Sequence, residues 1–506
     1  MALPIVDAMN VADRLAGLTS WHDDWSGLRV AVLGLGTTGF AAADTLAELG
    51  ADVLVVAERA DEQRTAMVRV VGAELVQASP LIEPPERLRE FGAELIIVSP
   101  GFHPDHPLLA WASEKSIAVW GDIELAWRLR DKVGAPAEWI TVTGTNGKTT
   151  TVQLTATMLA AAGLRAAPCG NIGIPVLDAI RDPGGFDVLV VELSSYQLHW
   201  INRNPGGEIS PYASVCLNIA DDHIDWHGSR EAYRAAKGRV YQNTRVACVY
   251  NTEDDATQQL VRDADVVEGA RAIGFGRGIP GPSDIGIVDG ILVDRAFLDE
   301  RFTSAIELTT LDELRTVRLD APHIVANILA ASALARSFGV APAIIHDALS
   351  QFQLDEHRIQ LVADVDGIAW VDDSKATNPH AADASLRAFG SVVWIAGGLL
   401  KGVEVDQLVG AHAARLRAAV LIGRDRDALR VAFARHAPAL PVFEVDADET
   451  DDVMRAAVAL AAAVARAGDT VLLAPAAASM DQFTDYAQRG SLFAQAVRDL
   501  VGGEGR

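Results

Sequence analysis

The chain has 506 residues, half of them apolar, and its 43 Lys and Arg residues against 68 Asp and Glu residues give a formal net charge of −25 at pH 7. This length exceeds what a single hydrophobic core supports and predicts about three domains. The negative charge disfavours non-specific binding to nucleic acid or to an anionic membrane, although a local positive site can still bind an anionic substrate.

The sequence carries no pattern typical of export or of a membrane span. Its N-terminus lacks a basic segment followed by an apolar one, and no run of about 18 uncharged apolar residues occurs. The cysteines, Cys169, Cys216 and Cys248, are scattered and form no CxxC pair. They indicate neither a disulfide framework nor a zinc site. We therefore expect a protein of the reducing cytoplasm.

The N-terminal part of the chain predicts a strand, a glycine turn, a helix and a second strand. The apolar strand at 29–33 leads into Gly34-Leu-Gly36-Thr37-Thr38-Gly39 and an Ala-rich helix. The second strand, 52–57, ends beside Glu58. A GxGxxG turn with an acidic residue about 20 positions further on is the fingerprint of a dinucleotide site. Taken alone, this unit predicts a nicotinamide dinucleotide.

A second glycine turn follows another β-branched run. Residues 140–143 lead into Gly144-Thr145-Asn146-Gly147-Lys148-Thr149-Thr150, and a helix-like segment follows. Backbone N–H groups in such a turn and the helix dipole both favour an anion. Lys148 can reach the outer phosphates of ATP, and the Thr149 hydroxyl can bind Mg²⁺. Val142 stands where the standard GxxxxGK[ST] motif has its first glycine, so this is a variant phosphate loop.

Polar side chains follow two further predicted strands of the same domain. The strand at 187–191 ends in Glu192, and the strand at 213–217 is followed by His223. Open α/β sheets place their ligands at the carboxyl ends of strands. A carboxylate and an imidazole can bind a divalent ion, although Mg²⁺ prefers oxygen. The alternative is a pair of polar caps at the sheet edge.

The C-terminal part repeats the alternation of strands and helices. The strand at 368–371 runs into Asp373, Lys375 and Thr377, which suit substrate or nucleotide contacts. The alternative is that Thr377 or its neighbour caps the next helix. Two more segments have candidate ligands: Lys401 in a glycine-rich loop, and Ser479 in a predicted strand, turn and helix start, where Ser479 could instead be a helix cap.

These patterns predict an α/β protein of three domains. We expect an N-terminal Rossmann-like domain at residues 1–135, a central P-loop ATPase-type α/β domain at 136–354 and a C-terminal Rossmann-like α/β domain at 355–506. The small, Pro-containing segment 133–138 suits a linker between the first two domains.

Taken together, several motifs resemble the Mur ligase family of ATP-dependent amide ligases, which build peptidoglycan precursors. The segments that carry this resemblance, which covers nearly the whole chain, are 144–149, Glu192-Leu-Ser-Ser, Asp222-His223-x-Asp225 and His357-Arg358. Within the family, four segments are most similar to the member that adds D-glutamate: Ser99-Pro-Gly101, Gly121-Asp-Ile-Glu-Leu125, 192–198 and 372–378.

The resemblance implies a role for individual residues. ATP would be bound by Gly144, Thr145, Asn146, Gly147, Lys148, Thr149, Thr150, Asn171, Asn327, Arg358 and Asp373. The metal ligands would be Thr149, Glu192, His223 and Lys237, and the catalytic residues would be Lys148, His223 and Lys237. D-glutamate would be bound by Lys375, Thr377, Lys401, Ser479 and Tyr486, and the UDP moiety by Gly34, Gly36, Thr37, Thr38, Gly39 and Arg59.

The resemblance also implies the reaction and its cofactors. We expect ATP, two Mg²⁺ ions and a carbamylated Lys237, with UDP-N-acetylmuramoyl-L-alanine and D-glutamate as substrates of a monomeric enzyme. Lys237 has this role by resemblance alone, because a helical lysine is ordinarily a solvated charge. Tyr486 departs from the phenylalanine expected at its position, although it remains an aromatic platform.

Three alternatives remain open from the sequence. The first is another amide ligase of this fold, of the folylpolyglutamate type or another Mur type. The second is an NAD-dependent dehydrogenase, based on the first glycine turn and Glu58. The third is a nucleotide-binding scaffold without catalytic activity.

Overall fold

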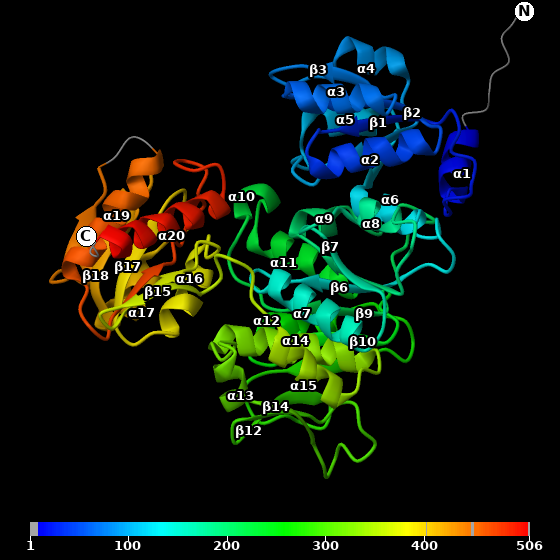
Figure 1. The fold of residues 1–506 in the computed structure, drawn as a ribbon. Coiled ribbons are helices and arrows are strands. Elements are labelled where there is room, and N and C mark those ends of the chain that lie inside the picture. Colours follow the sequence, from blue (N-terminus) through cyan, green and yellow to red (C-terminus); the bar gives the residue numbers. More distant parts are fainter. Residues whose placement is uncertain (1–8, 401, 447–449, 504–506) are drawn as a thin grey trace, which may run out of the picture. The chain divides into compact units, whose positions relative to one another are not determined.

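The structure, a computed structural model, describes residues 9–400, 402–446 and 450–503 (Figure 1). Its backbone contacts divide the chain into two units. The first comprises the chain up to Ile219 together with 223–317 and 325–352, and the second comprises 220–222, 318–324 and the chain from Gln353 onward. The first unit contains a five-stranded and a nine-stranded sheet, and the second contains a six-stranded sheet.

The N-terminal sheet is parallel, with the order β3-β2-β1-β4-β5. Its strands are β1 (Arg29–Leu33), β2 (Asp52–Ala57), β3 (Glu74–Gln77), β4 (Leu95–Val98) and β5 (Ala118–Gly121). The helices of this region are α1 (Met9–Gly17), α2 (Thr37–Glu48), α3 (Glu62–Val70), α4 (Glu86–Phe91), α5 (Pro107–Glu114) and α6 (Asp122–Arg128). Successive residues of β1 belong to opposite core clusters, since Val30 packs with α2 and Ala31 with α5. Both faces are therefore buried, as a parallel sheet requires.

The central sheet has the order β14-β13-β12-β11-β10-β9-β6-β8-β7. Its strands are β6 (Glu138–Thr143), β7 (Ala166–Gly170), β8 (Val188–Glu192), β9 (Ala213–Cys216), β10 (Ala247–Asn251), β11 (Arg271–Phe275), β12 (Asp284–Val288), β13 (Ile291–Asp294) and β14 (Ile306–Thr310). Strands β6 to β12 pair in parallel, whereas β12, β13 and β14 pair antiparallel. Strands β12 and β13 form a hairpin, in which Val288 pairs with Ile291.

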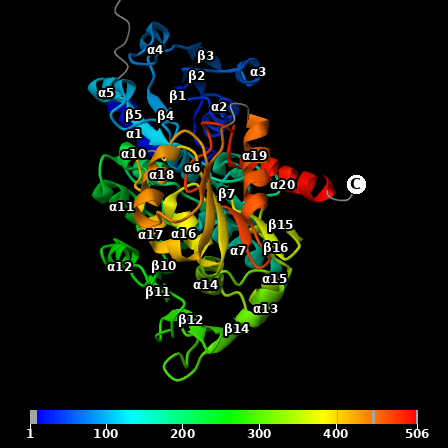
Figure 2. The same ribbon diagram turned by 90° about the vertical axis from the view of Figure 1, so that its left-hand side faces the viewer.

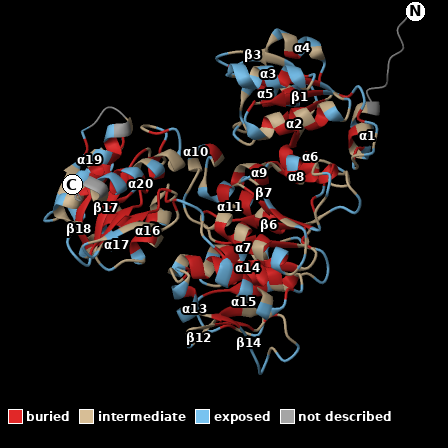
Figure 3. Ribbon diagram, in the orientation of Figure 1, coloured by how far each residue is buried: buried red, intermediate tan, exposed pale blue. Residues whose placement is uncertain are grey.

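Helices connect these central strands. They are α7 (Lys148–Ala161), α8 (Val176–Ile180), α9 (Ser195–Trp200), α10 (Ile224–His227), α11 (Arg230–Gly238), η1 (Arg239–Tyr241), α12 (Asp255–Arg262), α13 (Leu311–Thr316), α14 (Pro322–Ser337) and α15 (Pro342–Gln351). Cys169, Cys216 and Cys248 are buried free thiols of this region. Figure 3 shows that buried residues fill the sheet, whereas exposed residues lie on the outward faces of the helices.

The C-terminal sheet has the order β15-β16-β20-β17-β18-β19 and is parallel except for its edge strand β15. Its strands are β15 (Gln360–Val365), β16 (Ile368–Asp372), β17 (Val392–Gly397), β18 (Leu416–Ile422), β19 (Val442–Glu444) and β20 (Thr470–Leu473). Its helices are α16 (Pro379–Arg387), α17 (Asp406–His412), η2 (Ala413–Arg415), α18 (Arg426–His436), α19 (Thr450–Val464) and α20 (Tyr486–Gly503). Helices α16 to α18 cover one face of this sheet, and α19 and α20 cover the other (Figure 2).

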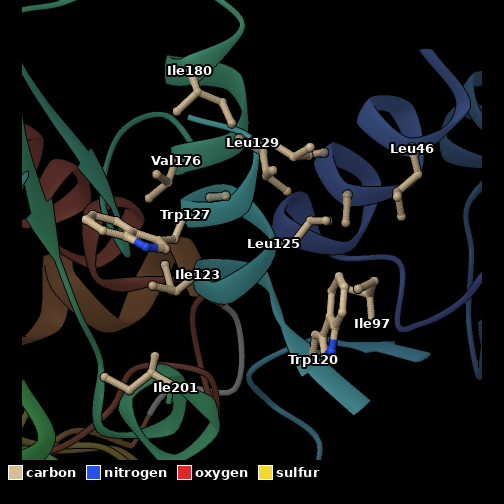
Figure 4. Packing of buried hydrophobic residues seen from close by; sticks show 14 of the residues in the cluster. Leu46, Ile97, Trp120, Ile123, Leu125, Trp127, Leu129, Val176, Ile180 and Ile201 are labelled. Carbon is tan, nitrogen blue, oxygen red and sulfur yellow. The ribbon is translucent and has the colours of Figure 1, made fainter. Parts of the chain in front are cut away.

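One apolar cluster joins the first two sheets through helix α6. Figure 4 shows Leu46 of α2, Leu125 of α6 and Leu129, the C-cap residue of α6, on one side, with Val176 and Ile180 of α8 on the other. An ion pair adds a polar contact between the same two regions, because the Arg181 guanidinium lies 2.8 Å from the Glu48 carboxylate. Helix α6 therefore packs against both the N-terminal and the central parts of the first unit.

The predicted fold class, three α/β domains, is confirmed. The domain boundaries at 135 and 354 stay predictions. The helix predicted to start near Ser479 begins instead at Tyr486, because residues 479–483 form a turn in which the Ser479 carbonyl accepts from the Phe483 N–H at 2.9 Å. Among the described residues, no helix combines the length and the apolar character needed to cross a membrane.

Candidate active site

The phosphate loop connects β6 to the N-terminus of α7. Its second glycine, Gly147, has φ +85°, a conformation that glycine adopts readily and other residues rarely do. A Cβ atom at this position would lie 2.3 Å from Oδ1 of Asn327. Gly147 is therefore required both for the turn and for the close approach of Asn327, which the sequence predicts as a nucleotide ligand.

Two residues that the sequence analysis did not select hold this loop. The Asn218 carbonyl accepts from the Thr145 N–H at 2.9 Å, and the Asn218 side chain exchanges hydrogen bonds with the Asn146 backbone at 2.9 and 3.1 Å. The Tyr233 hydroxyl lies 2.9 Å from the Thr145 hydroxyl. Asn218 could have been found as a polar residue directly after a strand, whereas nothing in the sequence distinguishes Tyr233.

Lys148 and Lys237 meet at the same backbone carbonyl. Lys148 Nζ donates to Gly144 O at 2.9 Å and to Thr145 O at 3.0 Å. Lys237 Nζ donates to Gly144 O at 2.8 Å and lies 3.4 Å from the Thr143 hydroxyl. The view that Lys237 is a solvated surface charge is wrong, because the residue is only 2% exposed. The fold thus places two ammonium groups beside the N-terminus of α7.

Glu192 lies at the end of β8 and is 2% exposed. Its two carboxylate oxygens accept hydrogen bonds from the Thr149 hydroxyl and the Asn171 amide, both at 3.0 Å. The structure therefore brings together three of the residues predicted to bind the nucleotide and its metal. A hydroxyl and a carboxylate oxygen at one point are the hard donors that Mg²⁺ prefers, so these residues fit that ion.

His223 is the N-cap residue of α10 and has φ +54°. Its Nδ1 atom lies 2.6 Å from the hydroxyl of Tyr196 on α9, the helix that follows Glu192. Among the residues that the structure describes, no group of three or more His, Cys, Asp or Glu side chains could hold a metal ion by itself. In nucleotide sites Mg²⁺ usually keeps water and phosphate oxygens among its ligands.

The N-terminal glycine turn is built for close packing. A Cβ atom at Gly39 would lie 2.2 Å from the carbonyl oxygen of Gly34. Gly36 is the N-cap residue of α2, and the exposed Thr37 opens that helix, followed by the half-buried Thr38.

Two residues of interest follow the second strand, β2. Arg59, which is predicted to bind the UDP moiety, is exposed. The Glu58 carboxylate, on which the dinucleotide alternative depends, accepts the Leu81 N–H at 3.0 Å.

In the C-terminal unit, Asp373 is buried at the end of β16. Its carboxylate accepts hydrogen bonds from the Ile359 N–H at 3.3 Å and from the Ser385 hydroxyl. Burial raises the pKa of Asp373 to about 6, and the positive charge of Arg358 acts in the opposite direction. The structure therefore places two of the predicted nucleotide ligands, Arg358 and Asp373, within electrostatic reach of each other.

The described residues predicted to bind D-glutamate lie after β16, after β20 and at the start of α20. Lys375 Nζ is 3.7 Å from the centre of the Tyr486 ring, so the expected aromatic platform faces a cation. Thr377 precedes Asn378, whose side chain caps α16 by accepting the Ala381 N–H at 2.9 Å. Ser479 is buried and lies in a turn, so the view that it caps a helix is wrong. Lys401 lies outside the described residues.

Comparison with known proteins identifies the relatives of the chain. Family models for the Mur ligase MurD-like N-terminal domain, the Mur ligase middle domain and the Mur ligase glutamate ligase domain match residues 28–121, 142–335 and 357–477. A UDP-N-acetylmuramoylalanine–D-glutamate ligase from Leifsonia xyli subsp. xyli is 72% identical, covering 97% of this chain and 96% of the relative. One of the same name from Streptomyces avermitilis is 54% identical, covering 94% and 99%.

Solved structures share the fold at low sequence identity. The UDP-N-acetylmuramate–alanine ligase MurC of Thermotoga maritima aligns with a TM-score of 0.54 and 18% identity, covering 93% of this chain and 99% of that one. The MurF ligase of the same organism, solved in complex with ADP, has a TM-score of 0.52 and 16% identity, covering 88% and 95%. With full-length relatives at 54–72% identity, the chain belongs to the Mur ligase family.

Proposed function

We propose that this protein is an ATP-dependent ligase that joins D-glutamate to UDP-N-acetylmuramoyl-L-alanine and releases ADP and phosphate, in the cytoplasmic synthesis of peptidoglycan precursors. The observation that carries the proposal is the buried Glu192 carboxylate, hydrogen-bonded to Thr149 at the N-terminus of α7 beside Lys148. This arrangement suits a magnesium nucleotide. The names of the relatives at 72% and 54% identity support D-glutamate as the amino acid.

The chemistry follows from the weakness of a carboxylate as an acyl donor. Transfer of the γ-phosphate of ATP to the terminal alanine carboxylate gives an acyl phosphate, which the amine of D-glutamate attacks with loss of phosphate. Lys148 would neutralise charge that develops on the transferred phosphoryl group, together with the backbone N–H groups at the start of α7. Magnesium bound at Thr149 and Glu192 would add electrostatic stabilisation of the same charge.

Lys237 is the proposed site of carbamylation, with two magnesium ions in the complete site. Its amine is buried beside Gly144, and a carbamate there would supply the oxygen ligands that Mg²⁺ prefers. His223 would bind the second ion or orient the attacking amine. Mass spectrometry of the intact protein tests the modification: no CO₂ adduct, and turnover independent of added bicarbonate, would contradict it.

The remaining ligands are proposed by position. In the N-terminal domain, residues 1–135, the Gly34–Gly39 turn with Thr37, Thr38 and Arg59 would bind the UDP moiety. In the C-terminal domain, residues 355–506, Arg358 and Asp373 would bind ATP, and Lys375, Thr377, Lys401, Ser479 and Tyr486 would bind D-glutamate. The enzyme is proposed to act as a monomer.

A substrate panel tests the proposal against its rivals. Purified enzyme with ATP, Mg²⁺ and UDP-N-acetylmuramoyl-L-alanine is expected to release phosphate with D-glutamate, and not with L-glutamate, meso-diaminopimelate or L-alanine. Equal turnover with L-glutamate would contradict the proposed substrate and favour another ligase of this fold. A parallel titration with NAD separates the dehydrogenase alternative, since tight NAD binding would overturn the assignment of the first glycine turn.

A further inference from the structure

A buried arginine in helix α20 lies among the loops of the C-terminal unit that carry the proposed amino-acid ligands. Arg489 is 0% exposed, and its guanidinium donates from all three nitrogens. Nε donates to the Ser374 hydroxyl at 3.0 Å, Nη2 donates to the Ser374 carbonyl at 2.9 Å, and Nη1 donates to the Ala477 carbonyl at 3.1 Å. Burial lowers the pKa of Arg489 to about 10, so the group remains charged at neutral pH.

Each of these contacts reaches a segment next to a proposed D-glutamate ligand. Ser374 directly precedes Lys375, and Ala477 lies two residues before Ser479. The Ser374 hydroxyl also donates to the backbone carbonyl of Tyr486 at 2.7 Å. The guanidinium of Arg489 therefore connects α20 to two other segments. One contains Ser374, 115 positions earlier in the sequence, and the other contains Ala477, 12 positions earlier.

The same network continues to the loop before β15. The Ser374 N–H donates to one oxygen of Asp372 at 2.9 Å, and the other oxygen lies 2.6 Å from Nδ1 of His357. The residue after Arg489 must be small to allow this packing, because a Cβ atom at Gly490 would lie 2.2 Å from His357 Nδ1. The contacts of Arg489 are thus part of a closely packed polar layer beneath the loops.

We propose that Arg489 is a positioning residue for the amino-acid substrate: it fixes the 374–375 loop, the 477–479 turn and the start of α20 in one geometry without contacting the substrate itself. This inference rests on the proposed function. A guanidinium suits the task because its donors form a planar, pre-organised fork, whereas a lysine ammonium is a flexible point charge. Misplacement of a substrate-positioning loop by about 1 Å can cost as much as about a hundredfold in rate.

The test replaces Arg489 with lysine, which keeps the positive charge but removes the planar guanidinium. Arg489→Lys is expected to raise the KM for D-glutamate about tenfold or more and to leave the KM values for ATP and for UDP-N-acetylmuramoyl-L-alanine within about twofold. Ser374→Ala, which removes the hydroxyl shared by Arg489 and Tyr486, is expected to change the same KM in the same direction. Arg498→Lys is the matched control, because Arg498 lies on the same helix but is exposed.

The outcomes separate this inference from the proposed function. A selective rise in the KM for D-glutamate supports the positioning role, and an unchanged KM, or an equal loss toward all substrates, overturns it. If circular dichroism shows that Arg489→Lys is not folded, the KM of Ser374→Ala for D-glutamate decides the question, and a selective rise in it again supports the positioning role. Absence of D-glutamate-dependent phosphate release by the wild type would contradict the proposed function itself, whereas an active wild type with insensitive variants would contradict this inference alone.

Discussion

Two lysine ammonium groups approach one backbone carbonyl in the phosphate loop. Lys148 and Lys237 both donate to Gly144 O, at 2.9 and 2.8 Å. Like charges this close repel each other strongly when they are partly removed from water. The N-terminus of α7 adds positive potential at the same place. A bound phosphate would lower this repulsion between the unmodified lysines, and so would the proposed carbamylation of Lys237, which replaces its positive charge with a negative one.

Removal of Lys148 tests this electrostatic role. Lys148→Ala is expected to lower kcat by at least about 10²–10³-fold, because one preorganised donor to developing charge contributes that much in comparable sites. Steady-state phosphate release gives the rate, and circular dichroism reports whether the fold is intact. Lys115→Ala is the matched control, since Lys115 is exposed at the end of α5. Retained turnover in folded Lys148→Ala would refute the phosphate role.

At the scale of elements, the site is made where β6, β8 and β9 end and α7 begins. The three strands are neighbours in the central sheet. Glu192 ends β8, Asn218 follows β9, and the phosphate loop follows β6, so one edge collects groups that are distant in the sequence. The polar residues at the ends of these strands could be predicted from the sequence, because each follows an apolar run. The order of the strands in the sheet could not be predicted, because it depends on long-range pairing.

Substitution of Gly147 tests the contact between this loop and α14. Gly147→Ala and Gly163→Ala both place a side chain at positive φ, +85° and +88°, at opposite ends of α7. Each is expected to lower the free energy of unfolding by about 1–3 kcal/mol. Only at Gly147 does the new Cβ meet Asn327, because nothing lies within 4 Å of a Cβ at Gly163. Calorimetric titration with ADP should therefore show about tenfold weaker binding for Gly147→Ala alone. Equal ADP affinity in both variants would contradict the role of this contact.

At the scale of the whole molecule, a buried ion pair within α6 is also hydrogen-bonded to the central part of the first unit. Glu124 and Arg128, both of α6, are fully buried, with carboxylate and guanidinium 2.9 Å apart. Arg128 also donates to the carbonyl of Leu18, and Asn204 of the central domain donates to Glu124 at 2.8 Å. Burial raises the pKa of Glu124 to about 7, although Asn204 and Arg128 favour its charged form.

This shift predicts how the stability of the first unit depends on pH. A carboxyl group whose pKa is raised on folding binds its proton more tightly in the folded state, so its contribution to stability is lost as pH rises from about 4.5 to about 7. Glu124→Gln removes the titration. Denaturant unfolding of both proteins is expected to show the wild type losing stability relative to the variant across that range, with no further change above it. If the difference in the free energy of unfolding between the wild type and Glu124→Gln does not vary with pH, the prediction is contradicted.

The sequence by itself determined the features that are local in the chain. The glycine turns, the Lys148 and Thr149 pair and the carboxylate after an apolar strand each follow from a few adjacent residues, because turn geometry and strand ends depend on neighbouring φ and ψ angles. The fold class followed from the alternation of strands and helices in the same way. Local patterns also misled, for example at Ser479, because the helix predicted there begins at Tyr486.

Only the tertiary structure decided which groups lie together and which are buried. Lys237 has the pattern of a surface lysine, yet long-range packing of α11 against the phosphate loop buries it. Arg489 reaches Ser374 across 115 positions of the sequence, and no spacing or periodicity encodes such a contact. Burial and hydrogen-bond partners depend on residues that are distant in the chain, and these properties determine what a charged side chain does in this protein.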